Sequence, residues 1–137
     1  MGTRSLTKVL DSKGEVLVCM CRQYDGYQSG HGQELKDFLD SKVIVNGFQN
    51  DRDESLANGM GCLAAQLVCN FKVCVGGFYL YPVNSDTEYI DFIYTVYPQS
   101  GSHTPELMIK CEFGFNSGKV LYEGLVSDYA PTDEEGE

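Results

Sequence analysis

The chain has 137 residues, of which 42% are hydrophobic and 12% aromatic, and this composition is typical of one globular domain. Its formal net charge of -10 argues against direct nucleic-acid binding, because contact with phosphates requires a basic face. No apolar run approaches the roughly 20 residues that cross a bilayer, and no apolar signal region follows Met1, so we expect a cytoplasmic protein that does not span a membrane.

The first half of the chain predicts a β-hairpin followed by two helices. Strand-like segments at Ser5 to Leu10 and Glu15 to Cys21 are joined by the turn-forming residues 11–14. Apolar residues at helical spacing predict one helix over Gly32 to Ser41 and a second from about Ser55 to Asn70. Glycines inside the second helix predict close packing of its backbone against a neighbouring element; they are Gly59 and Gly61.

The second half reads as strands separated by turns. Alternating apolar residues predict strands at Phe78 to Val83, Glu88 to Tyr97, Glu106 to Phe113 and Lys119 to Val126. The order ββααββββ predicts an α+β fold, with two helices on one face of a mainly antiparallel sheet of about five to six strands. We expect a single domain over residues 1–127 and an acidic, solvated tail over residues 128–137.

The open sheet face offers a hypothesis about self-association. Four tyrosines on the predicted strands would form an aromatic patch suited to a homodimer if they gathered there, and half-packed surface tyrosines are an equal interpretation; they are Tyr79, Tyr81, Tyr89 and Tyr97. The six cysteines are expected to be reduced, since no secretion signal accompanies them. Their spacing forms no C-x-x-C pair, and no metal site or cofactor is expected.

The most distinctive segment runs from Arg22 to Leu35 and joins a predicted strand to the first helix. The start of a helix has unpaired backbone N–H groups and a dipole that favours anions. We therefore expect this segment to hold a small anionic ligand, with Arg22 supplying charge, aromatic rings supplying stacking faces and the glycines supplying backbone donors. The expected ligand-binding residues are Arg22, Gln23, Tyr24, Asp25, Tyr27, Gly30, His31 and Gly32.

Turn chemistry is the competing interpretation of the same segment. Asp25 and Gly26 suit a tight turn, and Ser29 suits a helix cap, without any ligand. A third interpretation is catalysis, in which Asp25 and His31 form an acid–base pair. The sequence leaves these alternatives open because it does not supply their geometry.

The segment also resembles a known family. The opening Gly2-Thr3-Arg4-Ser5-Leu6 and the later run Arg22 to Tyr27, Gly30-His31-Gly32 and Glu34-Leu35 resemble a family of small uncharacterised proteins of bacteria, phages and large DNA viruses. The resemblance covers about the first 40 residues and implies no activity. A viral or phage setting would place the protein in the host cytoplasm.

The leading hypothesis is a non-enzymatic binding module that holds a small anionic ligand, such as a nucleotide, or a host protein through the loop from Arg22 to Gly32. The first alternative is a hydrolase or transferase acting on a phosphate ester or nucleotide. The second is a structural or virion interaction protein.

Overall fold

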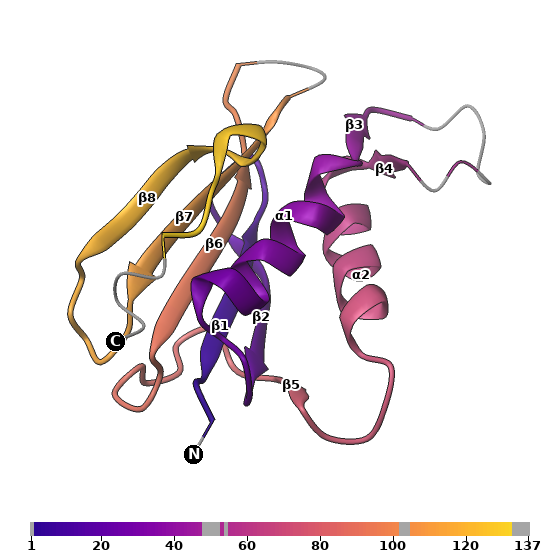
Figure 1. The fold of residues 1–137 in the computed structure, drawn as a ribbon. Helices are drawn as coiled ribbons and strands as arrows, with labels where there is room; N and C mark the ends of the chain where they lie inside the picture. The colour runs from indigo at the N-terminus through magenta and orange to yellow at the C-terminus, as the bar shows by residue number, and fades with distance from the viewer. Residues whose placement is uncertain (1, 48–52, 54, 102–104, 133–137) are drawn as a thin grey trace.

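The computed structural model describes residues 2–47, 53, 55–101 and 105–132. Its fold is α+β, as predicted: two helices lie on one face of a six-stranded mixed sheet (Figure 1). The strands of this sheet are β1 (Ser5–Leu10), β2 (Val16–Arg22), β5 (Phe78–Leu80), β6 (Phe92–Pro98), β7 (Leu107–Phe113) and β8 (Val120–Leu125). The helices are α1 (Gln33–Asp40), which follows the π-helical turn η1 (Gln28–Gly32), and α2 (Gly59–Phe71).

The sheet has the order β5-β2-β1-β6-β7-β8. Neighbouring strands are antiparallel except for β1 and β6, whose parallel register pairs Thr7 with Tyr94. The chain reaches this arrangement because β1 and β2 form a hairpin, which leaves the other side of β1 free for β6. The helices and β5 are inserted in sequence between these partners, so strand order does not follow chain order.

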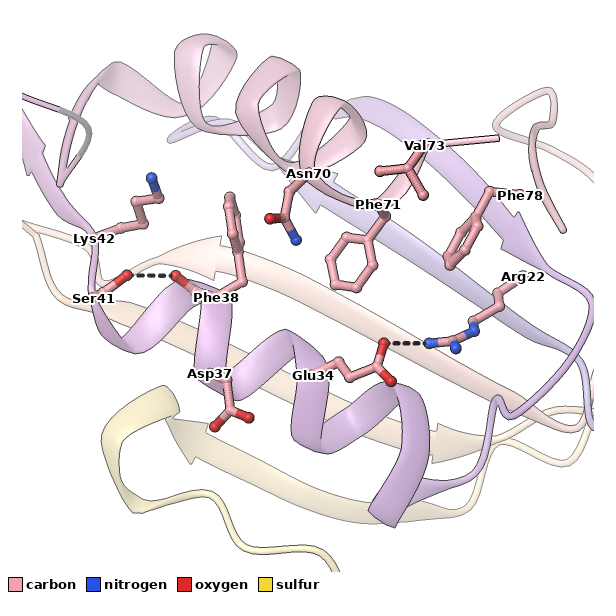
Figure 2. Close-up of a pocket in the computed structure, with 10 residues that line it drawn as sticks. All are labelled: Arg22, Glu34, Asp37, Phe38, Ser41, Lys42, Asn70, Phe71, Val73 and Phe78. Carbon is pink, nitrogen blue, oxygen red and sulfur yellow. Dashed lines mark hydrogen bonds and ion pairs between the residues drawn. The ribbon is translucent and has the colours of Figure 1, made fainter. Parts of the chain in front are cut away.

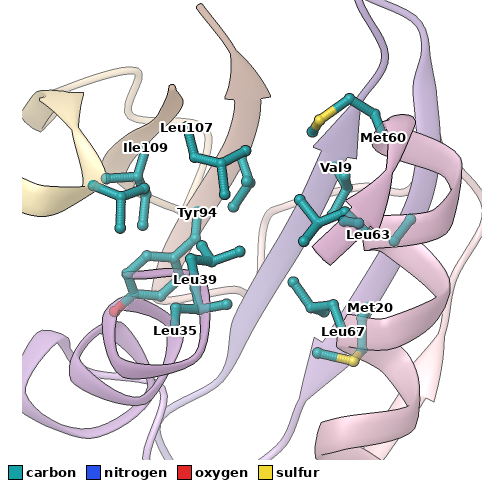
Figure 3. Close-up of a cluster of buried hydrophobic side chains, with 14 of the residues drawn as sticks. Val9, Met20, Leu35, Leu39, Met60, Leu63, Leu67, Tyr94, Leu107 and Ile109 are labelled. Atoms are coloured by element: carbon teal, nitrogen blue, oxygen red, sulfur yellow. The ribbon is translucent and has the colours of Figure 1, made fainter. Parts of the chain in front are cut away.

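The main core fills the space between the sheet and the helices (Figure 3). Leu35 and Leu39 of α1 and Leu63 and Leu67 of α2 are buried there against the sheet. Alternation along β6 and β7 directs every second residue to this face. The predicted amphipathic patterns therefore identified the buried side of both helices.

A small second core lies on the reverse face of the sheet. It consists of Leu6, Cys19, Cys21, Ile90 and Ile93. Ile90 belongs to the segment that leads into β6, so part of the face expected to be open is covered by the chain itself.

The predicted second helix begins too early. Residues Leu56–Asn58 form β4, which pairs in parallel with β3 (Val43–Val45) in a two-stranded sheet that the sequence pattern did not suggest. Gly59 then adopts a φ of 82°, a left-handed conformation that favours glycine and ends the strand. A Cβ atom on Gly59 or Gly61 would meet nothing within 4 Å, so the expected close packing at these glycines is wrong.

Two strands are shorter than predicted. β5 ends at Leu80 and is followed by Tyr81 and Pro82, and a proline cannot donate to a ladder. β6 begins at Phe92 rather than Glu88. The preceding residues form a turn instead, in which the N–H of Ile90 donates to the carbonyl of Thr87 at 3.1 Å.

The fold extends beyond the predicted boundary at residue 127. A 3₁₀ turn, η2 (Val126–Asp128), leads to Tyr129, which is only 1% exposed and belongs to the main core. Its hydroxyl donates to Oε1 of Gln28 at 2.9 Å. Residues 133–137 of the predicted tail lie outside the described residues.

Candidate functional site

The predicted site segment is tied to the N-terminus of the chain. The N–H of Gly26 donates to the carbonyl of Thr3 at 2.9 Å, and a Cβ atom on Gly26 would lie 2.8 Å from that same oxygen. Gly2 packs equally closely against Tyr24. The N-terminal segment and the loop after β2 are therefore in direct contact, and close backbone packing explains one glycine in each, Gly2 and Gly26.

His31 is the centre of the segment and is completely buried. Arg22 Nη1 donates to His31 Nδ1 at 3.1 Å, which requires Nδ1 to be unprotonated because a guanidinium only donates. Nε2 must then carry the hydrogen and donate it to Oγ1 of Thr7 at 2.7 Å. Burial, and secondarily the Arg22 charge, lower the pKa of His31 from 6.5 to about 3.

Aromatic rings complete the surroundings of His31. Its ring centroid lies 5.1 Å from that of Phe71, 5.4 Å from Tyr94 and 6.3 Å from Phe78. With both nitrogens bonded and the ring enclosed, His31 positions Arg22 and does not face a ligand. The acid–base alternative needs a ring nitrogen that can exchange a proton with substrate, and in this geometry both are occupied.

Arg22, one of the predicted binding residues, lines a groove on the protein surface. Its Nη1 also donates to Oε1 of Glu34 at 2.7 Å, and its guanidinium carbon lies 5.0 Å from the centroid of the Phe78 ring. The side chain is only 13% exposed. Nη2 lies 4.0 Å from the Asp25 carboxylate, which is an ion-pair distance but beyond hydrogen-bond distance.

The glycines of the segment do not offer backbone donors to a ligand. The N–H groups of Gly30 and Gly32 donate to the carbonyl of Tyr27, and that of His31 donates to the carbonyl of Asp25. A Cβ atom would lie 2.5 Å from the Asp25 carbonyl oxygen at Gly30 and 2.5 Å from the Tyr129 hydroxyl at Gly32. The expected anion seat at the helix start is therefore filled by the protein's own groups.

The other predicted residues lie on the outer side of the loop. Tyr24 is 60% exposed and Tyr27 is 36% exposed, and neither lines the groove beside Arg22. Asp25 adopts a φ of 62°, in agreement with the turn interpretation, and Gln23 uses its N–H to pair with the carbonyl of Gly77. The expected cap at Ser29 does not form, since neither η1 nor α1 has a side-chain cap.

The groove lies between α1, the end of α2 and β5, and has a volume of about 670 Å³ (Figure 2). Three phenylalanine rings follow one another along it: the centroids of Phe38 and Phe71 are 6.1 Å apart, and those of Phe71 and Phe78 are 5.7 Å apart. A cation stands at each end of this row, with Arg22 on Phe78 and Lys42 Nζ 4.9 Å from the Phe38 centroid. Polar side chains complete the lining: Glu34, Asp37, Ser41 and Asn70.

Sequence reasoning did not identify the phenylalanines or Lys42 as site residues. Phe38 fits the apolar stripe of the first predicted helix. Phe71 lies just beyond the predicted end of the second helix. Nothing in the one-dimensional pattern brings these residues to Phe78, which is far from Phe38 in the chain. Their aromatic side chains could have indicated a binding site, but aromatic side chains are equally typical of a hydrophobic core.

Metal ligands do not cluster in the part of the chain that the structure describes, where no group of three His, Cys, Asp or Glu side chains could hold an ion. The cysteines in that part are free thiols. No helix among the described residues is long and apolar enough to cross a membrane.

Comparison with known proteins yields no relationship: no family model, no curated protein and no solved structure matches this chain.

Proposed function

We propose that the protein is a non-enzymatic binding module whose ligand is a small molecule that combines a planar ring with an anionic group, as a nucleotide does. The observation that carries this proposal is the row of three phenylalanine rings with a cation at each end of the groove. In this proposal Arg22 of the predicted loop remains a binding residue. The ligand lies in the groove and not against the loop glycines.

The phenylalanine rings provide the apolar part of the site. Phe71 is almost buried at the centre, whereas Phe38 and Phe78 are half-buried on either side of it. A planar ring can contact such faces by offset or edge-to-face packing, which adds about 1 kcal/mol per aromatic pair beyond the area buried. Asn70 lies on the groove wall and supplies an amide that can recognise polar atoms on the ring edge (Figure 2).

The two cations provide the anionic part. Arg22 is held in place by His31 and Glu34, so little side-chain entropy is lost when a ligand binds to it. Lys42 extends over Phe38 at the other end and also interacts electrostatically with Asp53, and its ammonium group is suited to a phosphate or carboxylate. Each cation has an acidic neighbour, Glu34 beside Arg22 and Asp53 beside Lys42, so we assign the contact with the anion to the two cations together.

The test is calorimetric titration of the full chain with nucleoside monophosphates, the corresponding nucleosides and inorganic phosphate. We expect a monophosphate to bind more tightly than either of its parts. Lys42→Ala should weaken monophosphate binding about tenfold, or about 1.4 kcal/mol, and leave nucleoside binding nearly unchanged.

Lys119→Ala is the matched control, because Lys119 also lies over a phenylalanine ring, that of Phe113, but outside the groove. It should bind as the unmodified chain does. The proposal is wrong if no compound of the series binds, or if both lysine variants bind equally well.

A further inference from the structure

Residues 73–83 place apolar side chains on the surface around β5. Six of these side chains are exposed, with Val73 at 79% and Val75 at 101% of their reference area. We call this set the β5 edge surface: Val73, Val75, Tyr79, Leu80, Tyr81 and Val83. Apolar groups concentrated in this way on a protein surface are typical of an interaction site.

The backbone explains why these side chains are exposed. Gly76 and Gly77 have φ values of 83° and 78°, and this turn directs Val75 away from the body of the protein before β5 begins. β5 is the end strand of the sheet, so it is covered by a neighbouring strand on one side only. Register with β2 places Leu80 opposite Met20 and Tyr79 opposite Cys21, so exposed apolar groups lie on both faces of this end strand.

The outer edge of β5 has unpaired hydrogen-bonding capacity at one position. Gln23 donates to the Gly77 carbonyl and Tyr81 donates to the Cys19 carbonyl, so the intervening Leu80 directs its own N–H and C=O away from β2. At Phe78 the outward carbonyl is already bonded, because Lys72 Nζ donates to it at 2.7 Å. The edge can therefore form backbone hydrogen bonds with a partner at Leu80, but it does not suit the addition of a long strand.

Charge indicates which partner fits. Residues 73–83 contain no charged side chain, and the Nζ atom of the neighbouring Lys72 lies 5.2 Å from the centroid of the Tyr79 ring, so the surface carries a cation and no carboxylate of its own. The whole chain, by contrast, has a formal net charge of -10. Two copies of an acidic protein repel each other, and a surface without carboxylates is where they can approach with their negative charges furthest apart. A strongly basic partner would instead be drawn to an acidic surface, because that is where complementary charge is found.

We propose that the β5 edge surface binds a second copy of this chain in a two-fold symmetric dimer. A two-fold contact uses the same surface on both copies, and the mixed aliphatic and aromatic side chains here can pack against themselves. Val73 and Phe78 also line the groove, so the second copy would cover its open side next to Phe78. The dimer goes beyond the proposed ligand binding and does not rest on it.

Sedimentation equilibrium of the full chain tests the dimer, from micromolar to submillimolar concentration. We expect the mass to rise from the 15.2 kDa of one chain to twice that value. Val75→Asp should weaken dimerisation at least tenfold, because its side chain is fully exposed in the single chain and the substitution introduces a charge at the contact. Leu80→Asp should act in the same direction.

Val120→Asp is the matched control. Val120 is 43% exposed on β8, at the opposite end of the sheet, and the same substitution there should leave dimerisation unchanged. Val75 lies outside the strands, so its substitution does not disturb folding, and an unchanged circular dichroism spectrum verifies this. An unmodified chain that stays monomeric throughout would overturn the proposal, as would a Val75→Asp variant that dimerises like the control.

Discussion

The glycines of the loop between β2 and α1 are required by the protein's own packing. At Gly32 the missing Cβ atom leaves room for the hydroxyl of Tyr129, which lies 2.5 Å from where that atom would stand, and for the ring of Tyr94 at 3.3 Å. A side chain at this position must displace buried aromatic groups. Close packing against buried groups therefore explains the glycines of this loop. Turn propensities alone do not describe such contacts.

Substitution of two glycines with opposite surroundings tests this explanation. Gly32→Ala should destabilise the fold by about 1–3 kcal/mol, the usual cost of overpacking a core. Gly61→Ala should stabilise it by about 1 kcal/mol, because Gly61 lies in α2 with nothing near its missing Cβ atom and alanine is the better helix former. Urea unfolding of both variants measures the difference, and equal effects at the two positions would contradict the packing argument.

His31 makes stability depend on pH. The fold lowers its pKa to about 3, chiefly by burial, whereas the unfolded chain takes up a proton near the ordinary value of 6.5. The stability contributed by neutral His31 is therefore complete above pH 6.5 and is lost progressively as the pH falls toward 3. Below pH 6.5 this one group contributes a slope of up to about 1.4 kcal/mol per pH unit.

His31→Gln isolates the contribution of this side chain. Between pH 7 and pH 5, the unfolding free energy of the unmodified chain should fall by about 2 kcal/mol more than that of the variant. Both proteins carry the same carboxylates, so the difference between their urea midpoints reports His31 alone. Parallel pH profiles would show that the histidine titrates normally in the fold.

At the scale of elements, the C-terminal segment is part of the helix layer. Lys36 of α1 donates from Nζ to the carbonyls of Val126 and Ser127 at 3.1 Å and 2.8 Å. Tyr129 then inserts beside Gln28 and contacts the Tyr122 ring, with their centroids 5.2 Å apart. This segment fixes η1, and through η1 the position of His31.

Two substitutions at Tyr129 separate packing from hydrogen bonding. Tyr129→Ala should destabilise the fold by about 3–5 kcal/mol, the range for large-to-small changes in a core. Tyr129→Phe retains the ring and should cost about 1–2 kcal/mol, because the hydrogen bond from the hydroxyl to Gln28 is lost. Thermal unfolding ranks the two variants, and a small effect of Tyr129→Ala would mean that the tail begins before this residue.

On the whole-molecule scale, net charge and the β5 edge surface act against each other. The charge of -10 on each copy opposes association, whereas the exposed apolar side chains of this surface favour it. Tyr79 and Tyr81 belong to this surface, but Tyr97 lies apart from them, since β2 and β1 separate β5 from β6 and its hydroxyl donates to Glu123 on β8. The four tyrosines therefore do not form the single patch that the sequence suggested.

Salt dependence distinguishes an apolar dimer contact from an ionic one. Raising ionic strength from about 0.01 M to about 0.15 M shortens the Debye length from roughly 30 Å to roughly 8 Å and screens repulsion between the copies. Dimerisation through the β5 edge surface should therefore become tighter, measured by sedimentation at each salt concentration. A weaker dimer in salt would indicate that opposite charges hold the copies together.

The sequence by itself determined the fold class, the positions of both helices within a few residues and the buried faces of the main strands. These features follow from local periodicity, in which each residue's environment repeats every two or 3.6 positions. The extra strands at Val43–Val45 and Leu56–Asn58 were missed because three-residue segments have too little periodicity to detect.

Only the tertiary structure decided which residues meet. The sequence singled out Arg22 and His31 as candidate residues of one binding segment, yet it could not show that His31 is enclosed while Arg22 reaches a groove. It also could not bring Phe38, Phe71 and Phe78 together, because they come from three elements whose proximity depends on the insertion of both helices between β2 and β5. Contacts between residues distant in the chain follow from strand order and layer packing, and these are properties of the whole fold.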